Sequence, residues 1–396
     1  MQTELLKYLE VKKAYAVSLL SELIRIPTVN PPGENYEKIV SLLEKECRSL
    51  DLKTNRFLTP KKVMDRFGVR GGSRRISLLA DWQTGSKKTL HIASHYDVVP
   101  VTSKWTKDPF KTVIEGNKVY GRGSEDMKGN IACLLFTLQA IKKCGIKPKV
   151  NLQLSFTPDE EIGGRTGLGY LVKKNIVDAD YAMSEGYSQD CVSIGNKGVL
   201  WAEVTVKGKA AHASLPYKGV NSFERMVELA SEFEKLKKRI SKRKTKYFMK
   251  CARFKRPTFV MGGLLEGAPK VNIVPDIARF SIDRRLIPEE DVDVEREKIY
   301  GIVKRFNKKH KDSNASVRFI MDENPSISVK DERFFKTVAD SIKLVTGKRA
   351  KFSIMPGATD IRYFMQKKIP SVGYSARGGE SWHSDDEFVY IDSLVD

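Results

Sequence analysis

Cysteine is scarce in this 396-residue chain, and no two cysteines are spaced as a pair of metal ligands. The five cysteines are odd in number and scattered at Cys47, Cys133, Cys144, Cys191 and Cys251, without a C-x-x-C motif. Such usage is typical of reduced, mostly buried thiols in a cytosolic protein. It disfavours a disulfide framework, a thiolate metal site and a catalytic cysteine.

Long hydrophobic runs are missing as well. No apolar stretch approaches the roughly 18 residues that a membrane helix requires. The first 27 residues have the mixed charge of an amphipathic helix, rather than a charged tip followed by an apolar block. We therefore expect no membrane span and no signal peptide, and we predict a cytoplasmic location. The length and a hydrophobic content of 41% indicate a globular protein of two domains.

Acidic residues are outnumbered, which gives the chain a formal net charge of +21. Much of the excess lies in the segment 235–256, which contains no acidic residue. The segment has two readings: a phosphate-binding strip, with Tyr247 or Phe248 stacking on bases, or the solvated end of a helix and a loop. We favour the second reading, because basic excess alone informs on solubility and nonspecific attraction. Nucleic acid is therefore not an expected partner.

The order of the expected elements predicts an α/β fold with an inserted domain. Apolar strands and amphipathic helices alternate through the first half of the chain. From about residue 196 to 323 the pattern changes to β-α-β-β-α-β, a complete unit of the ferredoxin-like type. The α/β pattern then resumes to the end. We predict one domain from 1–195 and 324–396, and an inserted domain from 196–323.

Histidine is also rare, yet two of the five histidines belong to a set of metal-compatible residues at the ends of apolar segments. Histidine and carboxylate ligands without thiolate suit a hydrolytic Zn²⁺ site. The set is spread over separate stretches of the chain and consists of His95, Asp97, Asp126, Glu160, Glu161, Glu185 and His383.

Each part of this set also has a structural reading. His95 and Asp97 are two apart and project from the same face of a strand, so Asp97 can orient a metal-bound His95, but a structural histidine gives the same pattern. Asp126 follows a glycine-rich turn and could instead cap a helix. Glu160 and Glu161 end an apolar strand, where one could bind metal while the other acts as a general base, or both could lie in a solvated loop.

Together the segments resemble the dinuclear zinc-dependent aminoacylase and carboxypeptidase family, which includes acetylornithine deacetylase, succinyl-diaminopimelate desuccinylase and glutamate-releasing carboxypeptidases. The resemblance implies a catalytic domain of mixed sheet flanked by helices, with the inserted domain as a lid and dimerisation domain. It runs through nearly the whole chain. The matching segments are HYDVVP (95–100), WTKDPF (105–110), VYGRGSEDMKG (119–129), FTPDEEIGG (156–164), SEG (184–186), VKGKAAHASLPYKGVN (206–221), NIVPDIARFSIDRR (272–285), PGATD (356–360) and His383.

The resemblance also implies a role for each matching residue. His95 and Glu185 would bind one divalent ion, Glu161 and His383 the other, and Asp126 would bridge them. Zn²⁺ is the expected metal, although Co²⁺ or Mn²⁺ can occupy similar geometry. Glu160 would be the general base for metal-activated water, and Asp97 would orient His95.

Residues of the inserted domain and of a late loop are implied to contact the substrate. His212 would stabilise the oxyanion, commonly across a homodimer from the other subunit's inserted domain. Asn272 and Arg285 match positions that bind the substrate carboxylate, and Arg284 is adjacent to the second of these. Gly357 and Thr359 would line the substrate pocket.

The expected function is removal of the acyl group from an N-acyl amino acid, a small molecule that bears a carboxylate. A dipeptidase or carboxypeptidase with the same site is the alternative, because both reactions hydrolyse an amide beside a carboxylate. A nucleic-acid-binding protein on a hydrolase scaffold is a more remote alternative, supported by the basic segment alone.

Overall fold

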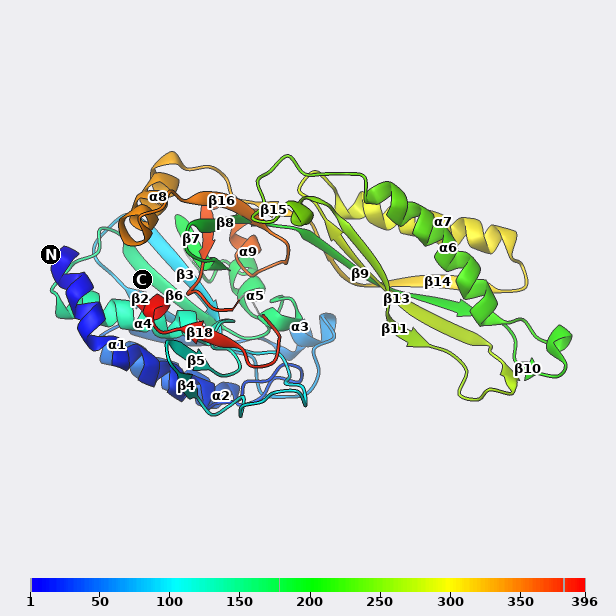
Figure 1. Ribbon diagram of the computed structural model, residues 1–396, viewed down its shortest axis with the longest axis horizontal. Helices are drawn as coiled ribbons and strands as arrows, with labels where there is room; N and C mark the ends of the chain where they lie inside the picture. The colour runs from blue at the N-terminus through cyan, green and yellow to red at the C-terminus, as the bar shows by residue number, and fades with distance from the viewer. Residues whose placement is uncertain (1, 178, 380–381, 396) are drawn as a thin grey trace. The chain divides into compact units, whose positions relative to one another are not determined.

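The computed structural model describes residues 2–177, 179–379 and 382–395, and the chain divides into two compact units (Figure 1). The first unit comprises Met1–Ile194, Ser328–Phe352 and Thr359–Asp396, and the second comprises Gly195–Ile327 and Ser353–Ala358. The short segment Ser353–Ala358 returns to the second unit, where the amide of Lys197 donates to the carbonyl of Met355 at 3.0 Å. Backbone pairing of this kind leaves no side-chain pattern, so the sequence does not signal it.

A mixed sheet lies at the centre of the first unit. Its strands are β1 (Lys53–Leu58), β2 (Ile76–Trp82), β3 (Thr89–His95), β6 (Asn151–Thr157), β7 (Tyr181–Tyr187), β8 (Cys191–Asn196), β15 (Ser326–Ile327), β16 (Lys351–Met355) and β17 (Ser371–Tyr374). Of these, β15 and the adjoining ends of β8 and β16 belong to the second unit. Among the described residues the order is β1–β2–β6–β3–β7–β17–β8–β15, with β16 paired to β8. β3 is parallel to β6 and β7, whereas β2 is antiparallel to β1 and β6. The carboxyl ends of β3 and β7 therefore meet at the same edge of the sheet.

Helices cover both faces of this sheet. They are α1 (Gln2–Ile24), α2 (Tyr36–Ser49), α3 (Lys61–Arg66), α4 (Lys128–Lys143), α5 (Leu168–Lys173), α8 (Glu332–Thr346) and α9 (Arg362–Gln366), with 3-10 turns η1 (Glu160–Ile162) and η4 (Asp392–Leu394). Leu90 and Ile92 of β3 pack with α1 and α4, whereas Ala93 packs with α5 and α9. Successive strand residues point to opposite faces, so the two groups of helices lie on opposite sides. The predicted mixed sheet flanked by helices is confirmed.

The start of α4 fixes the turn that carries Asp126. Buried residues recur three or four positions apart along α4, at Ile131, Leu135 and Leu138, and pack against α1. A Cβ on Gly129 would lie 2.2 Å from the carbonyl oxygen of Ser124, so only glycine allows the turn to fold this closely onto the helix. The turn is thereby held against the sheet edge.

A small sheet brings the last part of the chain to the same turn. It consists of β4 (Val113–Glu115), β5 (Lys118–Tyr120) and β18 (Phe388–Tyr390), in the order β18–β5–β4. Phe388 is paired with Tyr120, so the residues before β18 lie beside the residues after β5. His383 precedes β18, and Asp126 follows β5, which explains how two distant segments of chain meet.

The second unit contains a four-stranded antiparallel sheet among its described residues. Its main elements follow one another as β9 (Gly198–Lys207), α6 (Ser222–Ile240), β11 (Thr258–Glu266), β13 (Ile277–Leu286), α7 (Val292–Lys309) and β14 (Asn314–Glu323). The strand order is β11–β13–β9–β14. Two short strands, β10 (Ala211–His212) and β12 (Ile273–Val274), form a separate ribbon, and 3-10 turns lie at η2 (Pro216–Lys218) and η3 (Ala252–Lys255).

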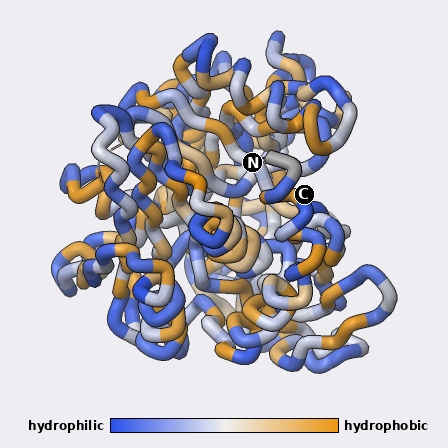
Figure 2. Tube along the Cα trace, turned by 90° about the vertical axis from the view of Figure 1, so that its left-hand side faces the viewer, coloured by the Kyte–Doolittle hydropathy of each residue, from blue (hydrophilic) through white to orange (hydrophobic). Residues whose placement is uncertain are grey.

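Both long helices of the second unit pack on one face of its sheet. The alternate residues Leu200, Ala202, Val204 and Val206 of β9 share a core with α6 and α7. Figure 2 shows hydrophilic and hydrophobic stretches alternating along the chain, with many of the outermost turns hydrophilic. No helix in the described part of the chain is long and apolar enough to cross a bilayer.

Candidate metal centre

His95 is the last residue of β3, and its ring is almost fully buried. Its Nδ1 lies 3.0 Å from the backbone oxygen of Asp97 and 3.5 Å from the carboxylate oxygen Oδ1 of the same residue. The expectation that the carboxylate of Asp97 accepts the ring N–H is therefore met more closely by its backbone carbonyl. With Nδ1 engaged, the other ring nitrogen, Nε2, faces the edge of the sheet.

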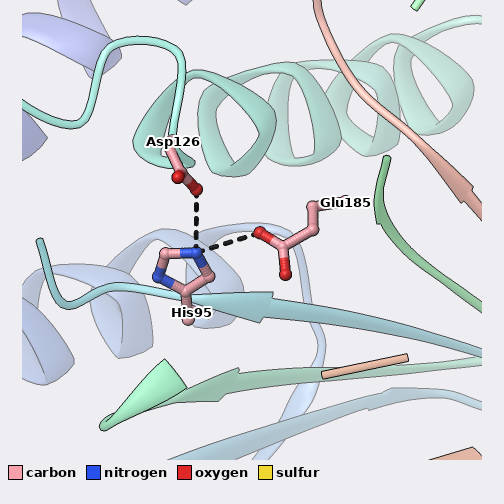
Figure 3. A group of neighbouring side chains, drawn as sticks. All are labelled: His95, Asp126 and Glu185. Atoms are coloured by element: carbon pink, nitrogen blue, oxygen red, sulfur yellow. Dashed lines mark hydrogen bonds and ion pairs between the residues drawn. The ribbon is translucent and has the colours of Figure 1, made fainter. Parts of the chain in front are cut away.

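Nε2 of His95 meets two carboxylates from separate elements (Figure 3). It lies 3.1 Å from Oδ1 of Asp126, in the turn before α4, and 3.0 Å from Oε2 of Glu185, on β7. The second oxygen of Glu185, Oε1, is buried without a hydrogen-bond partner. We call His95, Asp126 and Glu185 the first triad.

A second triad shares Asp126 with the first. Nε2 of His383 lies 3.0 Å from Oε2 of Glu161 and 3.5 Å from the other oxygen of Asp126, Oδ2. Asp126 thus turns one oxygen toward each histidine. The His383 side chain is 54% exposed, whereas the His95 side chain is 1% exposed, so the second triad lies nearer to solvent.

The two triads fit divalent cations. In each group the candidate ligand atoms lie within 4.8 Å of one another. Imidazole and carboxylate ligands suit Zn²⁺, and carboxylate-rich sites also accept Mn²⁺. The buried oxygen Oε1 of Glu185 has no hydrogen-bond partner, and a bound cation would provide a partner for it.

The pKa shifts at the two triads also indicate a site for cations. Burial and the charge of Asp126 raise the pKa of Glu161 to about 7. Hydrogen bonds to Asp126 and Glu161 raise the pKa of His383 to about 10. Burial and the charge of Glu185 raise the pKa of Glu160 well above its usual range. These shifts result from burying several carboxylates together, and a cation would oppose them.

Glu160 and Glu161 lie in the 3-10 turn η1, rather than at the strand end where the sequence placed them. The carboxylate of Asp97 holds this turn, because its Oδ1 accepts the amide of Glu160 and its Oδ2 accepts the amide of Glu161, each at 3.2 Å. In a 3-10 turn adjacent side chains are about 120° apart, whereas in a strand they point to opposite faces. Asp97 therefore contacts the backbone of the acidic pair as well as the ring of His95.

Asp159, which sequence reasoning missed, anchors the same turn from the other side. Its backbone is left-handed, with φ 67°, and its buried carboxylate pairs with Nε of buried Arg75 at 3.0 Å. Thr166 donates its hydroxyl to the same carboxylate at 2.5 Å. Asn30 donates from Nδ2 to Asp97 at 2.8 Å and to Asp159 at 3.0 Å. The polar sequence PDEE is the one local signal for Asp159, and nothing local identifies Arg75 or Asn30.

Three predicted substrate contacts belong to the second unit. His212 is exposed on β10, and its Nδ1 lies 2.7 Å from the hydroxyl oxygen of Ser214. Asn272 is exposed next to β12, and its carbonyl accepts the amide of Ala213 at 3.1 Å. The structure thus brings His212 and Asn272 together. Arg285 lies near the far end of β13 and is not part of this ribbon.

The two neighbouring arginines of β13 have different surroundings. Arg284 is fully buried, with Nη2 2.7 Å from Glu290 and 3.1 Å from Glu295. The Arg285 side chain is 27% exposed and bonds Asp283 through two nitrogens, at 2.8 and 3.0 Å. Arg284 is therefore committed to the interior of its unit, and Arg285 is the accessible guanidinium.

The two loop residues predicted to line the pocket fall in different units. Gly357 lies in the second unit, where its carbonyl accepts Nδ2 of Asn196 at 3.1 Å. Thr359 lies in the first unit and is 9% exposed.

Comparison with known proteins places this arrangement in a family. The model of peptidase family M20/M25/M40 matches residues 91–396. The chain belongs to this family. It is therefore a metallohydrolase that acts on amide or peptide bonds.

Other members of the M20 family are similar over nearly the whole chain. An uncharacterised metallohydrolase of Methanocaldococcus jannaschii is 30% identical over 96% of each chain. A probable succinyl-diaminopimelate desuccinylase of Staphylococcus aureus is 26% identical over 85% of this chain and 88% of its own. Similar proteins are named as a desuccinylase and as an aminoacylase, so the substrate differs among them.

Solved M20 structures share the fold. The M20 metallo-carboxypeptidase of Sulfolobus solfataricus has a TM-score of 0.76 and 23% identity, covering 96% of both chains. A dinuclear metal-binding M20 peptidase of Bacillus subtilis has a TM-score of 0.68 and 12% identity, covering 97% of this chain and 95% of its own. At these identities the likeness concerns the fold alone.

Proposed function

We propose that the chain is a dinuclear metal-dependent hydrolase that removes the acyl group from an N-acyl amino acid. His95 and Glu185 hold one cation, Glu161 and His383 hold the other, and Asp126 bridges them. The observation that carries this assignment is the division of the two Asp126 oxygens between the two triads. Zn²⁺ suits sites of histidine and carboxylate, and Co²⁺ or Mn²⁺ can replace it.

Two cations held by these triads would supply polarisation of the scissile carbonyl and acidification of water at neutral pH. The proton transfers fall to Glu160. Its amide is held by Asp97, and burial raises the pKa of its carboxyl group, which strengthens the carboxylate as a base. Glu160 takes the proton of the attacking water and returns it to the leaving amine. His212 would then donate to the oxygen that becomes negatively charged.

The substrate class rests on groups that recognise a carboxylate. Arg285 presents a guanidinium that can bind a carboxylate through two nitrogens, as it binds Asp283. A deacylase and a carboxypeptidase both require this contact. The relative named as a desuccinylase favours the deacylase, and the structural neighbour named as a carboxypeptidase keeps the exopeptidase as the second candidate.

We assign residues 196–323, within the second unit, as the inserted ferredoxin-like lid and dimerisation domain, and residues 1–195 and 324–396 as the catalytic domain. The ribbon that carries His212 and Asn272 directly precedes β13 in the chain, and Arg285 lies near the end of β13. Eight strand residues span about 26 Å, so one copy of the unit cannot place all three on one small substrate. This separation supports a homodimer in which the partner supplies His212 and Asn272. The cysteine usage supports a cytoplasmic location.

The dimer can be tested by mixing two inactive variants, His212→Ala and Glu160→Gln. If the partner supplies His212, a mixed dimer has one site with both residues intact. Random exchange of subunits then restores about a quarter of the wild-type sites. A mixture as inactive as its two components would contradict a shared site.

The function itself is tested by hydrolysis of N-acetyl- and N-succinyl-amino acids beside unblocked dipeptides, with the metal-loaded protein and a chelator control. We expect chelator-sensitive release from the acylated set. Cleavage of the dipeptides alone would assign the protein to the exopeptidases. No turnover of either set would overturn the proposal.

A further inference from the structure

The segment that follows His383 is attached to the rest of the first unit by consecutive carboxylates. Asp385 accepts the hydroxyl of Thr102 at 2.5 Å. Asp386 accepts the hydroxyl and the amide of Thr106 at 2.7 and 3.0 Å. His383 itself has a left-handed backbone, with φ 65°. The position of its ring therefore depends on how this segment is held.

Glu387, the next carboxylate, is buried and has four donors. Its Oε2 accepts Nη1 of Arg122 at 2.8 Å and the amide of Gly123 at 3.1 Å. Its Oε1 accepts the amide of Glu125 at 2.8 Å and the amide of Asp126 at 3.0 Å. One carboxylate thus binds the whole turn from Arg122 to Asp126. None of these contacts uses the side chain of Asp126, which stays directed at the two histidines.

Arg122 completes the connection to His383. It is buried, and besides Glu387 its Nη2 lies 3.5 Å from the carbonyl oxygen of His383. Its guanidinium also lies over the ring of Trp105, 5.0 Å from the centroid. The Arg122–Glu387 pair therefore contacts the backbone of both Asp126 and His383, which lie far apart in the sequence.

We propose that Glu387, paired with Arg122, is the positioning residue of the second triad and sets the affinity for the cation held there. This inference rests on the proposed function, in which Asp126 and His383 are ligands. The first triad shares Asp126 but differs in its other two members, because His95 and Glu185 lie on β3 and β7, whose positions are set by sheet pairing. The second triad draws His383 from a loop, so its geometry depends on side-chain bonds such as these.

The test compares Glu387→Gln with a matched control, Glu295→Gln. Glu295 is also buried and also pairs with a buried arginine, Arg284, but it lies in the second unit. A glutamine at 387 places an amide donor against either Arg122 and Gly123 or the amides of Glu125 and Asp126. Stepwise affinities for Zn²⁺ are measured by calorimetry with the metal-free full chain, and Co²⁺ absorption spectra report the geometry of each site.

We expect Glu387→Gln to weaken binding of one of two cations by about 10- to 100-fold and to change one of two Co²⁺ spectra. The other cation should be affected much less. Glu295→Gln should lower the melting temperature while it leaves both affinities unchanged. Glu387→Asp, which keeps the charge, should recover part of the lost affinity.

Two results would overturn the inference. Wild-type affinities for both cations in a destabilised Glu387→Gln would show that the pair is structural only. If Glu387→Gln does not fold, the same comparison is made with Glu387→Asp and Arg122→Lys, and unchanged affinities in both would have the same meaning. A wild-type chain that binds fewer than two cations would instead refute the ligand assignment of the proposed function, and this inference with it.

Discussion

The two units place their polar groups in opposite surroundings. In the first unit, His95, Asp97 and Glu185 are all at most 8% exposed, and each is held by neighbouring strands and turns. In the second unit, His212 and Asn272 are exposed on a short ribbon. Buried groups have their pKa values and positions set by the interior, so changing them affects stability as well as chemistry. Exposed groups can be changed with little effect on folding.

Each unit also contains residues that depart from this pattern. His383 belongs to the first unit but is half exposed, and Arg284 belongs to the second unit but is fully buried. For these two residues the degree of burial differs from that of the other polar groups in the same unit. Variants at these positions therefore test the effect of burial apart from the effect of the unit.

The largest expected effect is on catalysis in the first unit. Glu160→Gln should lower kcat by about 10²- to 10⁴-fold, because it removes the general base. Both metals should remain bound, since Glu160 is not among the proposed ligands. Steady-state kinetics and elemental analysis check the two statements. Glu115→Gln, at a side chain that is 55% exposed on β4, is the control and should match the wild type.

The two arginines of β13 should separate stability from substrate binding. Arg284→Ala should lower the free energy of unfolding by about 3 kcal/mol, because Glu290 and Glu295 would lose their fully buried partner and keep the more exposed Arg243. Arg285→Ala should change stability little but raise KM for carboxylate substrates about 10- to 100-fold. Urea unfolding and kinetics measure both variants. The reverse order of KM values would show that Arg284, not Arg285, contacts the substrate.

A smaller effect is expected from His91, which lies on β3 with His95 but whose ring nitrogens contact neutral side chains, Gln153 at 3.0 Å and Ser155 at 2.8 Å. Burial lowers the pKa of His91 to about 4. Below its ordinary pKa the unfolded chain binds a proton there and the folded chain does not, so stability decreases as pH falls. From pH 7 to pH 5 the loss should be about 2 kcal/mol.

This contribution is isolated by measuring the free energy of unfolding of wild type and His91→Gln at both pH values. All other titrating groups are common to the two proteins. The variant should therefore lose less stability than the wild type on acidification. Equal losses would mean that His91 is protonated in the folded state as readily as in the unfolded chain.

Much of the site could be anticipated because its signals are local. His95 and Asp97 are two apart in an apolar strand, and Asp126 follows a glycine-rich turn. The mixed sheet flanked by helices could likewise be predicted from the alternation of apolar strands and amphipathic helices, together with the family resemblance. What the resemblance supplied was the pairing of distant segments, such as His383 with Glu161.

The supporting contacts could not be anticipated. Arg75 bonds Asp159 across 84 positions of chain, and Arg122 bonds Glu387 across 265. A buried ion pair between distant segments leaves no periodic pattern in either segment. From the sequence alone, each of its residues is therefore predicted to be an exposed charge. The 3-10 turn of Glu160 and Glu161 was missed for a similar reason, because it is imposed by the carboxylate of Asp97.

The central claim is that two triads share Asp126 and hold two cations. The measurement that tests it most directly is the number of metal ions bound per chain in wild type, His95→Ala and His383→Ala, by elemental analysis after dialysis. The account predicts two ions in the wild type and one in each variant, with His95→Ala also less stable by about 1–3 kcal/mol. Equal metal content in wild type and His383→Ala would contradict it.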